Sequence, residues 1–157
     1  MSARPKTLRR WLKSTSNRTF VLWPVLLLLL RAFLDDGWPR INLWGLPLLA
    51  WGYGQYWWVG RLRTARGGGG PGLSNPPERL VTDGPYRWTR NPMYLGHLVF
   101  FAGLAIMLSW PAVLVFVAHC VWFDRRARAD EAHLTELFGP PYQAYAGRVK
   151  RWIPGVY

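Results

Sequence analysis

The chain has 157 residues, enough for one domain, and half of them are apolar, 16% are aromatic and only 18% are charged. Its net charge of +12 would suggest a nucleic-acid partner for a soluble protein, but the long apolar runs argue against that interpretation. The single cysteine, Cys120, cannot form an intrachain disulfide, and no Cys/His cluster has zinc spacing, so no metal site is expected.

Residues 1–18 form a basic tail that is followed by the apolar stretch 19–34. This order resembles a signal peptide, but no small-x-small cleavage site follows, and more apolar segments come later. We therefore expect a first transmembrane helix at 19–34, which is short for a span of about 20 residues.

A second span is predicted at 41–60, which contains no charged residue and is rich in tryptophan and tyrosine. The polar loop 61–92 follows and includes "RGGGGPGLSNPP". This glycine run lacks the GK[ST] of a phosphate-binding loop, so it indicates a linker, or a lid over a bound ligand.

The third apolar run, 93–123, has 31 residues without Asp, Glu, Lys or Arg. One straight helix of that length would be about 46 Å long, which exceeds a hydrocarbon core of about 30 Å. Because "SWP" lies near its middle and Pro111 breaks the backbone hydrogen-bond ladder, we expect a hairpin of two helices.

Positive charge predicts the topology. Basic residues gather in the first 18 residues, in 61–92 and in the tail 124–157, whereas the 35–40 loop holds two Asp and one Arg. The fold class expected is an all-α membrane bundle of about four spans, with both termini cytoplasmic. The tail adds an amphipathic helix from Asp124 to Phe138, which "GPP" ends.

Two sets of polar residues in the tail have ordinary structural explanations. Arg126 and Asp130 stand four apart beside Glu131, as in any solvated amphipathic helix with an i,i+4 pair. Tyr142 and Tyr145, near a basic and tryptophan-bearing end, would by themselves indicate an interfacial anchor.

Two segments of the sequence, taken together, resemble a known family. "LVTDGPYRWTRNPMYLG" at 80–96, an apolar hairpin, and "DEAHLTELFGPPYQAYAGRVKRWIP" at 130–154 follow one another. In order and spacing they resemble the isoprenylcysteine carboxyl methyltransferase family, which is related to the phospholipid N-methyltransferases. The resemblance covers about half of the chain, and the first two spans match only in character.

This resemblance implies a membrane enzyme that holds S-adenosylmethionine between the two segments. Glu131 can pair with the cofactor's ammonium group, and tyrosine faces suit its adenine. Arg126 is the candidate catalytic residue, which would orient an anionic group of the methyl acceptor; a salt bridge to Asp130 is its alternative. The candidate cofactor-binding residues are Tyr86, Arg87, Arg90, Asn91, Pro92, Tyr94, Gly96, His97, Glu131, Tyr142 and Tyr145.

Three positions qualify the implied site. Many family members have His where this chain has Asn91, and Asn cannot titrate near neutrality. The family's Glu-Glu pair is Asp130-Glu131 here, so Glu131 is the stronger candidate. His97 is an ionisable residue inside a span, which favours function, although a buried, hydrogen-bonded neutral His is the alternative.

The expected function is methyl transfer to a lipid or lipid-like acceptor, either an isoprenylcysteine carboxylate or a phospholipid amine. The alternatives are an NADPH-dependent membrane reductase related to sterol reductases, and an inactive membrane scaffold. The expected partners are the bilayer and the acceptor, without nucleic acid, and four spans leave room for a homo-oligomer. A bacterial inner membrane is the expected location.

Overall fold

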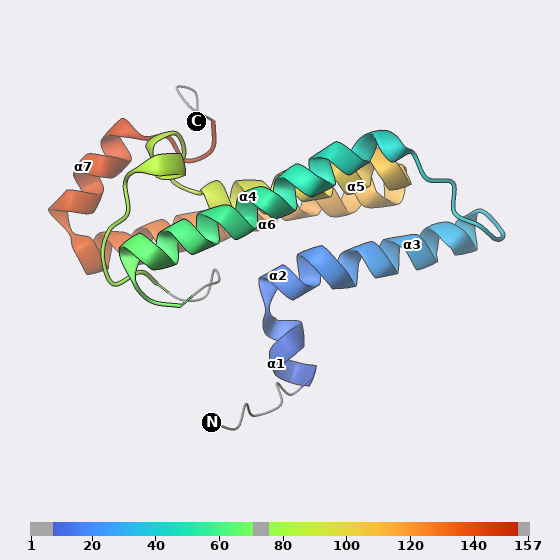
Figure 1. The fold of residues 1–157 in the computed structure, drawn as a ribbon, viewed down its shortest axis with the longest axis horizontal. Helices are drawn as coiled ribbons and strands as arrows, with labels where there is room; N and C mark the ends of the chain where they lie inside the picture. The colour runs from blue at the N-terminus through green and yellow to red at the C-terminus, as the bar shows by residue number, and fades with distance from the viewer. Residues whose placement is uncertain (1–7, 71–75, 154–157) are drawn as a thin grey trace.

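The computed structural model describes residues 8–70 and 76–153, with side chains from Trp11 onward. Every regular element within these ranges is helical, which confirms the all-α prediction (Figure 1). The elements are α1 (Leu8–Lys13), α2 (Thr15–Asn17), η1 (Arg18–Leu22), α3 (Trp23–Leu34), η2 (Leu43–Gly45), α4 (Leu46–Gly67), η3 (Gly84–Arg87), α5 (Pro92–Leu108), α6 (Trp110–Phe138) and α7 (Pro140–Arg148).

One helix of the described residues is long and apolar enough to cross a membrane. It is the continuous helix Thr15–Leu34, made of α2, η1 and α3, which extends the expected first span toward the N-terminus. The apolar α5 is shorter, with 17 residues. Glycine, tryptophan and tyrosine lower the hydropathy of α4, and the second half of α6 is charged, so four spans are not established by length and composition.

The helices α4 and α5 pack with their backbones in close contact because glycines lie on both facing sides. A Cβ added to Gly52 would lie 2.5 Å from the Phe100 amide nitrogen and 2.6 Å from the Gly96 carbonyl oxygen. One added to Gly45 would lie 2.3 Å from the Gly103 carbonyl oxygen. Small residues at this spacing let two helices approach as they do in membrane bundles.

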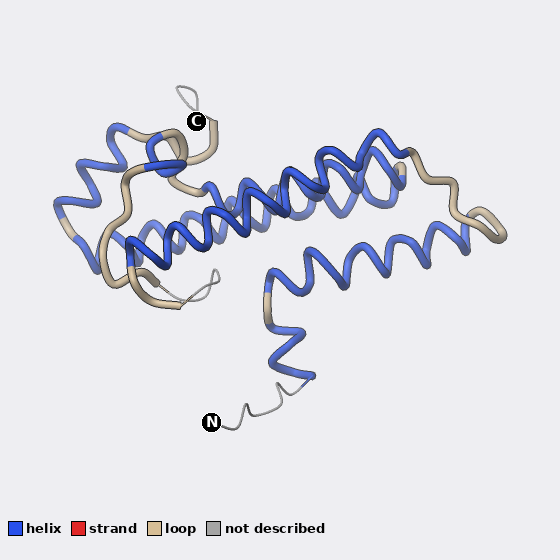
Figure 2. The backbone as a smooth tube through the Cα atoms, in the orientation of Figure 1, coloured by secondary structure: helices blue, strands red, loops and turns tan. Residues whose placement is uncertain are grey.

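The predicted hairpin is confirmed, and it turns at Ser109 between α5 and α6 (Figure 2). Ser109 has φ 63°, and its carbonyl accepts the first backbone hydrogen bonds of α6 from Ala112 and Val113. The predicted boundary at 123 is not a helix end, because α6 continues unbroken from Trp110 to Phe138. The change from apolar to charged residues at Asp124 therefore marks a change of surroundings within one helix.

The chain reverses a second time at Gly139, as "GPP" predicts. Gly139 has φ 59°, a conformation that suits glycine, and α7 begins at the next residue, Pro140. This break folds α7 and the segment after it back over the start of α5 (Figure 1).

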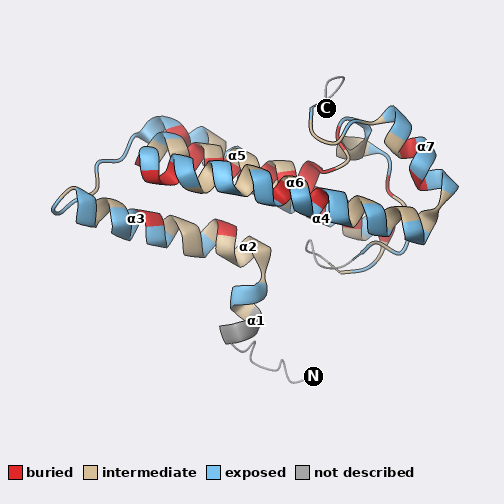
Figure 3. Cartoon of the chain, turned by 180° about the vertical axis from the view of Figure 1, so that it is seen from behind, coloured by how far each residue is buried: buried red, intermediate tan, exposed pale blue. Residues whose placement is uncertain are grey.

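The N-terminal helix contacts the rest of the bundle mainly through its first half. The Ser16 and Tyr56 hydroxyls lie 2.5 Å apart, and the Phe20 ring stacks on His97 with a centroid distance of 4.7 Å. Leu27 reaches the main core, which also contains Phe101, Leu104 and Phe123. The α3 residues Leu28, Leu29, Leu30 and Leu34, which follow Leu27, are exposed. Figure 3 shows that exposed residues are frequent along α3.

Candidate functional site

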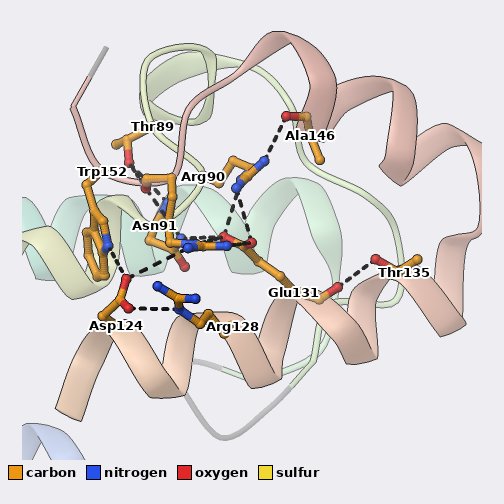
Figure 4. Close-up of polar contacts among 10 residues, drawn as sticks. Thr89, Arg90, Asn91, Asp124, Arg128, Glu131, Thr135, Ala146 and Trp152 are labelled. Carbon is orange, nitrogen blue, oxygen red and sulfur yellow. Dashed lines mark hydrogen bonds and ion pairs between the residues drawn. The ribbon is translucent and has the colours of Figure 1, made fainter. Parts of the chain in front are cut away.

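Glu131 joins the two segments that the sequence identified. Its carboxylate accepts hydrogen bonds from Arg90 Nε and Nη2 at 3.2 and 3.1 Å, and from Asn91 Nδ2 at 3.1 Å. Arg151 Nε and Nη2 donate to the same carboxylate at 3.0 and 2.9 Å. Figure 4 shows Arg90 and Asn91 beside Glu131. The side chains of Arg90, Arg151 and Glu131 are only 14%, 18% and 13% exposed. We call these four residues the Glu131 clamp.

Backbone contacts hold the 89–91 segment against the C-terminal residues. The Arg90 amide donates to the Lys150 carbonyl at 3.0 Å, and Arg90 Nη1 donates to the Ala146 carbonyl at 2.7 Å. The Thr89 hydroxyl donates to the Arg151 carbonyl at 2.7 Å and accepts from the Asn91 amide at 3.2 Å. The residues after α7 are thereby fixed beside the start of α5.

Asp124, about two turns before Glu131 on α6, supports the same end of the chain. It accepts from Trp152 Nε1 at 2.9 Å and from Arg128 Nε at 2.8 Å, and Arg151 Nη1 lies 3.8 Å away. The hydrogen bond from Trp152 is the largest cause that holds the pKa of the Asp124 carboxyl below its usual range, and Arg128 acts in the same direction. Asp124 is therefore a carboxylate at neutral pH.

The other acid of the pair, Asp130, binds different partners from Glu131. It accepts a hydrogen bond from the Tyr94 hydroxyl on α5, and Arg126 Nε lies 3.1 Å from its second oxygen. Arg126 thus makes the i,i+4 salt bridge that was the alternative to its catalytic role. Its side chain is nevertheless 44% exposed.

A cavity of about 90 Å³ lies between the 84–94 segment, α6 and α7. Pro77, Leu80 and Val81 form a further wall. Among the predicted site residues, those that line it are Tyr86, Arg90, Asn91, Pro92, Tyr94, Tyr142 and Tyr145.

Five predicted residues lie elsewhere. Gly96 is in the α4–α5 contact, Arg87 points to a separate groove, and Glu131 is enclosed by its clamp. Arg126 lies outside the cavity lining on α6. His97 is fully buried among the rings of Phe20, Tyr56 and Phe123, and its ring nitrogens bind no described residue.

The tyrosines around the cavity are neutral aromatic surfaces. The Tyr142 and Tyr145 rings lie 5.9 Å apart, and the Tyr145 hydroxyl donates to the Tyr86 carbonyl at 2.7 Å. Burial raises the pKa of Tyr86 to about 12 against the opposing effect of Arg63. Burial, followed by the Glu131 charge, raises the pKa of Tyr142 to about 12, and burial also raises that of Tyr145.

Sequence reasoning missed two arginines of this region. Arg63 is buried on α4, lines the cavity, and donates through Nη2 to the Gly70 carbonyl at 3.1 Å. Arg151 completes the Glu131 clamp from the C-terminal segment. The sequence offered only a general signal for both, since each belongs to a basic cluster that topology already explains.

The donor set at the cavity fits a zwitterion with aromatic parts. Asp130 brings negative charge, Arg63 brings positive charge, and four tyrosines bring flat neutral faces. Glu131 pairs with two guanidinium groups and does not line the cavity, whereas Asp130 pairs with Arg126 alone among the described residues and does line it. Asp130 is therefore the acid placed to meet a ligand in the cavity.

Known proteins resemble about half of the chain. Protein-S-isoprenylcysteine O-methyltransferase B of Arabidopsis thaliana is 38% identical over 81 residues, which are 50% of this chain and 41% of that protein. The fission yeast Schizosaccharomyces pombe protein-S-isoprenylcysteine O-methyltransferase is 32% identical over 82 residues, 51% of this chain and 35% of that protein. The Mus musculus protein of that name is 38% identical over 77 residues, 48% of this chain and 27% of that protein.

These matches span less than half the length of each relative. The sequence profile of the family described as "Phospholipid methyltransferase" matches more of the chain, over residues 43–141. That range begins before α4 and ends in α7, so it contains the 84–94 segment, the hairpin and the acidic pair. The chain belongs to the phospholipid methyltransferase family.

Proposed function

We propose that the chain is a membrane enzyme that transfers a methyl group from S-adenosylmethionine to a lipid or lipid-like acceptor. The observation that carries this proposal is the joining of Arg90 and Asn91 to Glu131 beside one tyrosine-lined cavity. These residues are 41 and 40 positions apart in the chain. The family match and the names of the similar proteins support the same chemistry.

The cavity residues have the chemistry that such a cofactor requires. S-adenosylmethionine, when bound, supplies a methyl group on a positively charged sulfur. Asp130 would bind its ammonium group, Arg63 its carboxylate, and the Tyr142 and Tyr145 faces its adenine. Ligand pockets usually have about 300–1,000 Å³, so the wall made by Pro77, Leu80 and Val81 would move outward on binding.

The Glu131 clamp would position these groups, since Glu131 and Arg151 lie outside the cavity lining while Arg90 and Asn91 belong to it. It ties the start of α5 and α6, which both line the cavity, to each other and to the segment after α7. Because positioning supplies much of the rate in a displacement reaction, a fixed cavity shape is itself part of the catalytic machinery.

Arg126 would contribute at the acceptor side. Its guanidinium is 44% exposed and pairs with Asp130, whose other oxygen accepts from Tyr94. An acceptor carboxylate or phosphate would compete for this guanidinium, which would bring the acceptor next to the acid that holds the cofactor.

The enzyme would lie in a bilayer through Thr15–Leu34, α4, α5 and the first half of α6. The long helix Thr15–Leu34 meets the requirements for a span by itself. Exposed apolar side chains continue on α6, at Val113, Leu114, Val117 and Val121. Basic residues at both ends of the chain favour cytoplasmic termini, with a bacterial inner membrane as the location.

The proposal is tested by labelled-methyl transfer and by calorimetry with S-adenosylhomocysteine. Purified wild-type protein should bind S-adenosylhomocysteine and label an acceptor among total membrane lipids or small thiols. Asp130→Asn should weaken binding at least about tenfold, as expected when a charged partner is lost. Glu136→Gln, on the exposed side of the same helix, is the matched control. A folded wild-type protein that binds no S-adenosylhomocysteine, or that NADPH alone stabilises, would overturn the proposal.

A further inference from the structure

A larger hollow lies on the other side of the 84–92 segment from the candidate cofactor cavity. Its volume is about 770 Å³, and its walls come from α4, from the start of α5 and from the 84–89 turn. Trp51, Trp58 and Trp88 surround it, Gly54 forms its base, and Arg87 lies at its polar end. We call this hollow the indole groove. Pro92 lines both the groove and the cofactor cavity, so the two are neighbours.

The groove exists because small and aromatic residues alternate along one face of α4. Ala50 and Gly54 are four residues apart, and Trp51 and Trp58 are seven apart, so all four lie on one helical stripe. A Cβ added at Gly54 would meet no atom within 4 Å. The stripe from Ala50 to Trp58 is about 12 Å long, which suits an extended hydrocarbon chain.

The polar group at the base of the groove is already satisfied. Gln55 Oε1 accepts from Trp51 Nε1 at 2.9 Å, and Gln55 Nε2 donates to the Pro92 carbonyl at 2.9 Å. The walls therefore present mainly apolar and aromatic surface. All three indoles are exposed, and tryptophan is enriched in membrane proteins at the interface between lipid tails and headgroups.

The charge at the groove is positive and unbalanced. Arg87 is exposed and makes no ion pair with a described residue, and no Asp or Glu lines the groove. A cationic headgroup or the ammonium of the cofactor would find no partner there, whereas a phosphate or carboxylate would. The lining thus favours an anionic amphiphile over a zwitterionic one.

We propose that the indole groove binds a membrane lipid with an anionic headgroup. The acyl chain lies over Gly54 between the indoles of Trp51 and Trp58, and the headgroup pairs with Arg87. This inference does not rest on methyl transfer, because it concerns a different cavity and its test measures bound lipid.

The test is native mass spectrometry of the purified full chain with phosphatidylglycerol and phosphatidylcholine of identical acyl chains, supplied in equal amounts. The wild-type protein should retain phosphatidylglycerol with a preference of about fivefold, the effect of one cation near an anionic lipid. Arg87→Gln should remove the preference but keep chain binding. Gly54→Leu, which fills open space, should remove both lipids.

Gly147→Leu is the matched control, since Gly147 is also a helical glycine with no atom near an added Cβ, and it lies on α7. Should Gly54→Leu fail to fold, Trp88→Ala removes one wall of the groove and should also lower retained phosphatidylglycerol. Equal retention of the two lipids by the wild type would overturn the proposal. The proposal would also be overturned if Gly54→Leu and Trp88→Ala both retained as much phosphatidylglycerol as the wild type. Occupation of the groove by a second copy of the chain would overturn it as well.

Discussion

Glu131 stabilises the site because its one carboxylate forms ion pairs with two largely buried guanidinium groups. Arg90 and Arg151 each present two donors to it, and Asn91 adds a third donor group. Removing one partner of such a cluster costs more than the cluster contributes in total, since it leaves charges buried without compensation. The identity of this one side chain should therefore matter for folding as well as for activity.

Glu131→Gln should lower the free energy of unfolding by about 3 kcal/mol, because the amide keeps the shape but cannot balance two arginines. Thermal unfolding in detergent checks the stability, and hydrogen exchange of residues 146–153 checks the docking of the tail. Glu136→Gln, which changes an acid that is 80% exposed, should leave both measurements unchanged. Faster exchange in both variants would contradict a specific role for Glu131.

The phenol of Tyr86 should stay protonated to unusually high pH. Burial raises its pKa to about 12 in the folded protein, whereas the unfolded phenol ionises near the ordinary tyrosine pKa of 10.0. The unfolded state therefore loses its proton first, and this residue's contribution to stability falls as pH rises from about 10 to 12. Absorbance titration of wild-type protein against Tyr86→Phe isolates this ionisation. A difference signal centred near pH 10 in folded protein would contradict the burial.

For individual residues, the sequence predicted which residue types lie at the site better than it predicted which groups they bind. Asn91 was expected at a cofactor, and it does line the cavity, but its amide also donates to Glu131. Glu131 was expected to meet an ammonium group, yet Arg151 from the C-terminal segment is there instead. A sequence motif indicates which residues lie at a site. Which of several nearby charged groups an acid pairs with depends on distances in the folded chain.

At the level of whole helices, the close packing of α4 against α5 has the clearest effect on the site. Glycines on both helices remove the side chains that would separate the two backbones. This contact fixes where α5 begins relative to α4, and so where Asn91 and Pro92 stand beside the cavity and the indole groove.

Gly52→Ala should destabilise the protein by about 1–3 kcal/mol, because the new methyl group would overlap the backbone of α5. Gly54→Ala, two residues along the same helix, adds its methyl group in open space and should be neutral or stabilising through helix propensity. Melting temperatures of the two variants in one detergent measure the difference. Equal melting temperatures would show that α4 and α5 are further apart than described.

The turns at Ser109 and Gly139 were predictable because proline and glycine act locally. The continuity of α6 was not, since a charged stretch after an apolar one looks the same in sequence whether the helix continues or restarts. The helical extension of α4 to Gly67 has the same origin, because its arginines are good helix formers that merely leave the apolar zone.

The charge distribution governs the molecule as a whole. The net charge of +12 comes from segments at one end of the proposed bundle, while the α3–α4 connection carries two Asp and one Arg. Such asymmetry orients a membrane protein and holds its cytoplasmic surface near anionic lipids. The proposed site and the positive surface would then share one side of the membrane.

Single-cysteine labelling should report that orientation. With Cys120 replaced by Ala, a membrane-impermeant maleimide should label Gln143→Cys from the cytoplasmic side only and Trp38→Cys from the opposite side only. Both positions are exposed, Gln143 on α7 and Trp38 in the α3–α4 connection. Comparison of right-side-out with inverted vesicles measures the side. Labelling of both residues from one side would contradict the four-span topology.

In the proposed membrane orientation, the unbroken α6 would connect the bilayer to the proposed site. Val117 on its apolar half and Asp130 on its polar half are thirteen residues apart. The helix between them is unbroken and about 20 Å long. A tilt of about ten degrees at Val117 would displace Asp130 by roughly 3 Å, enough to separate it from the Tyr94 hydroxyl. If the first half of α6 lies in a bilayer as proposed, membrane thickness would be one influence on its tilt, and therefore on the position of the acidic pair.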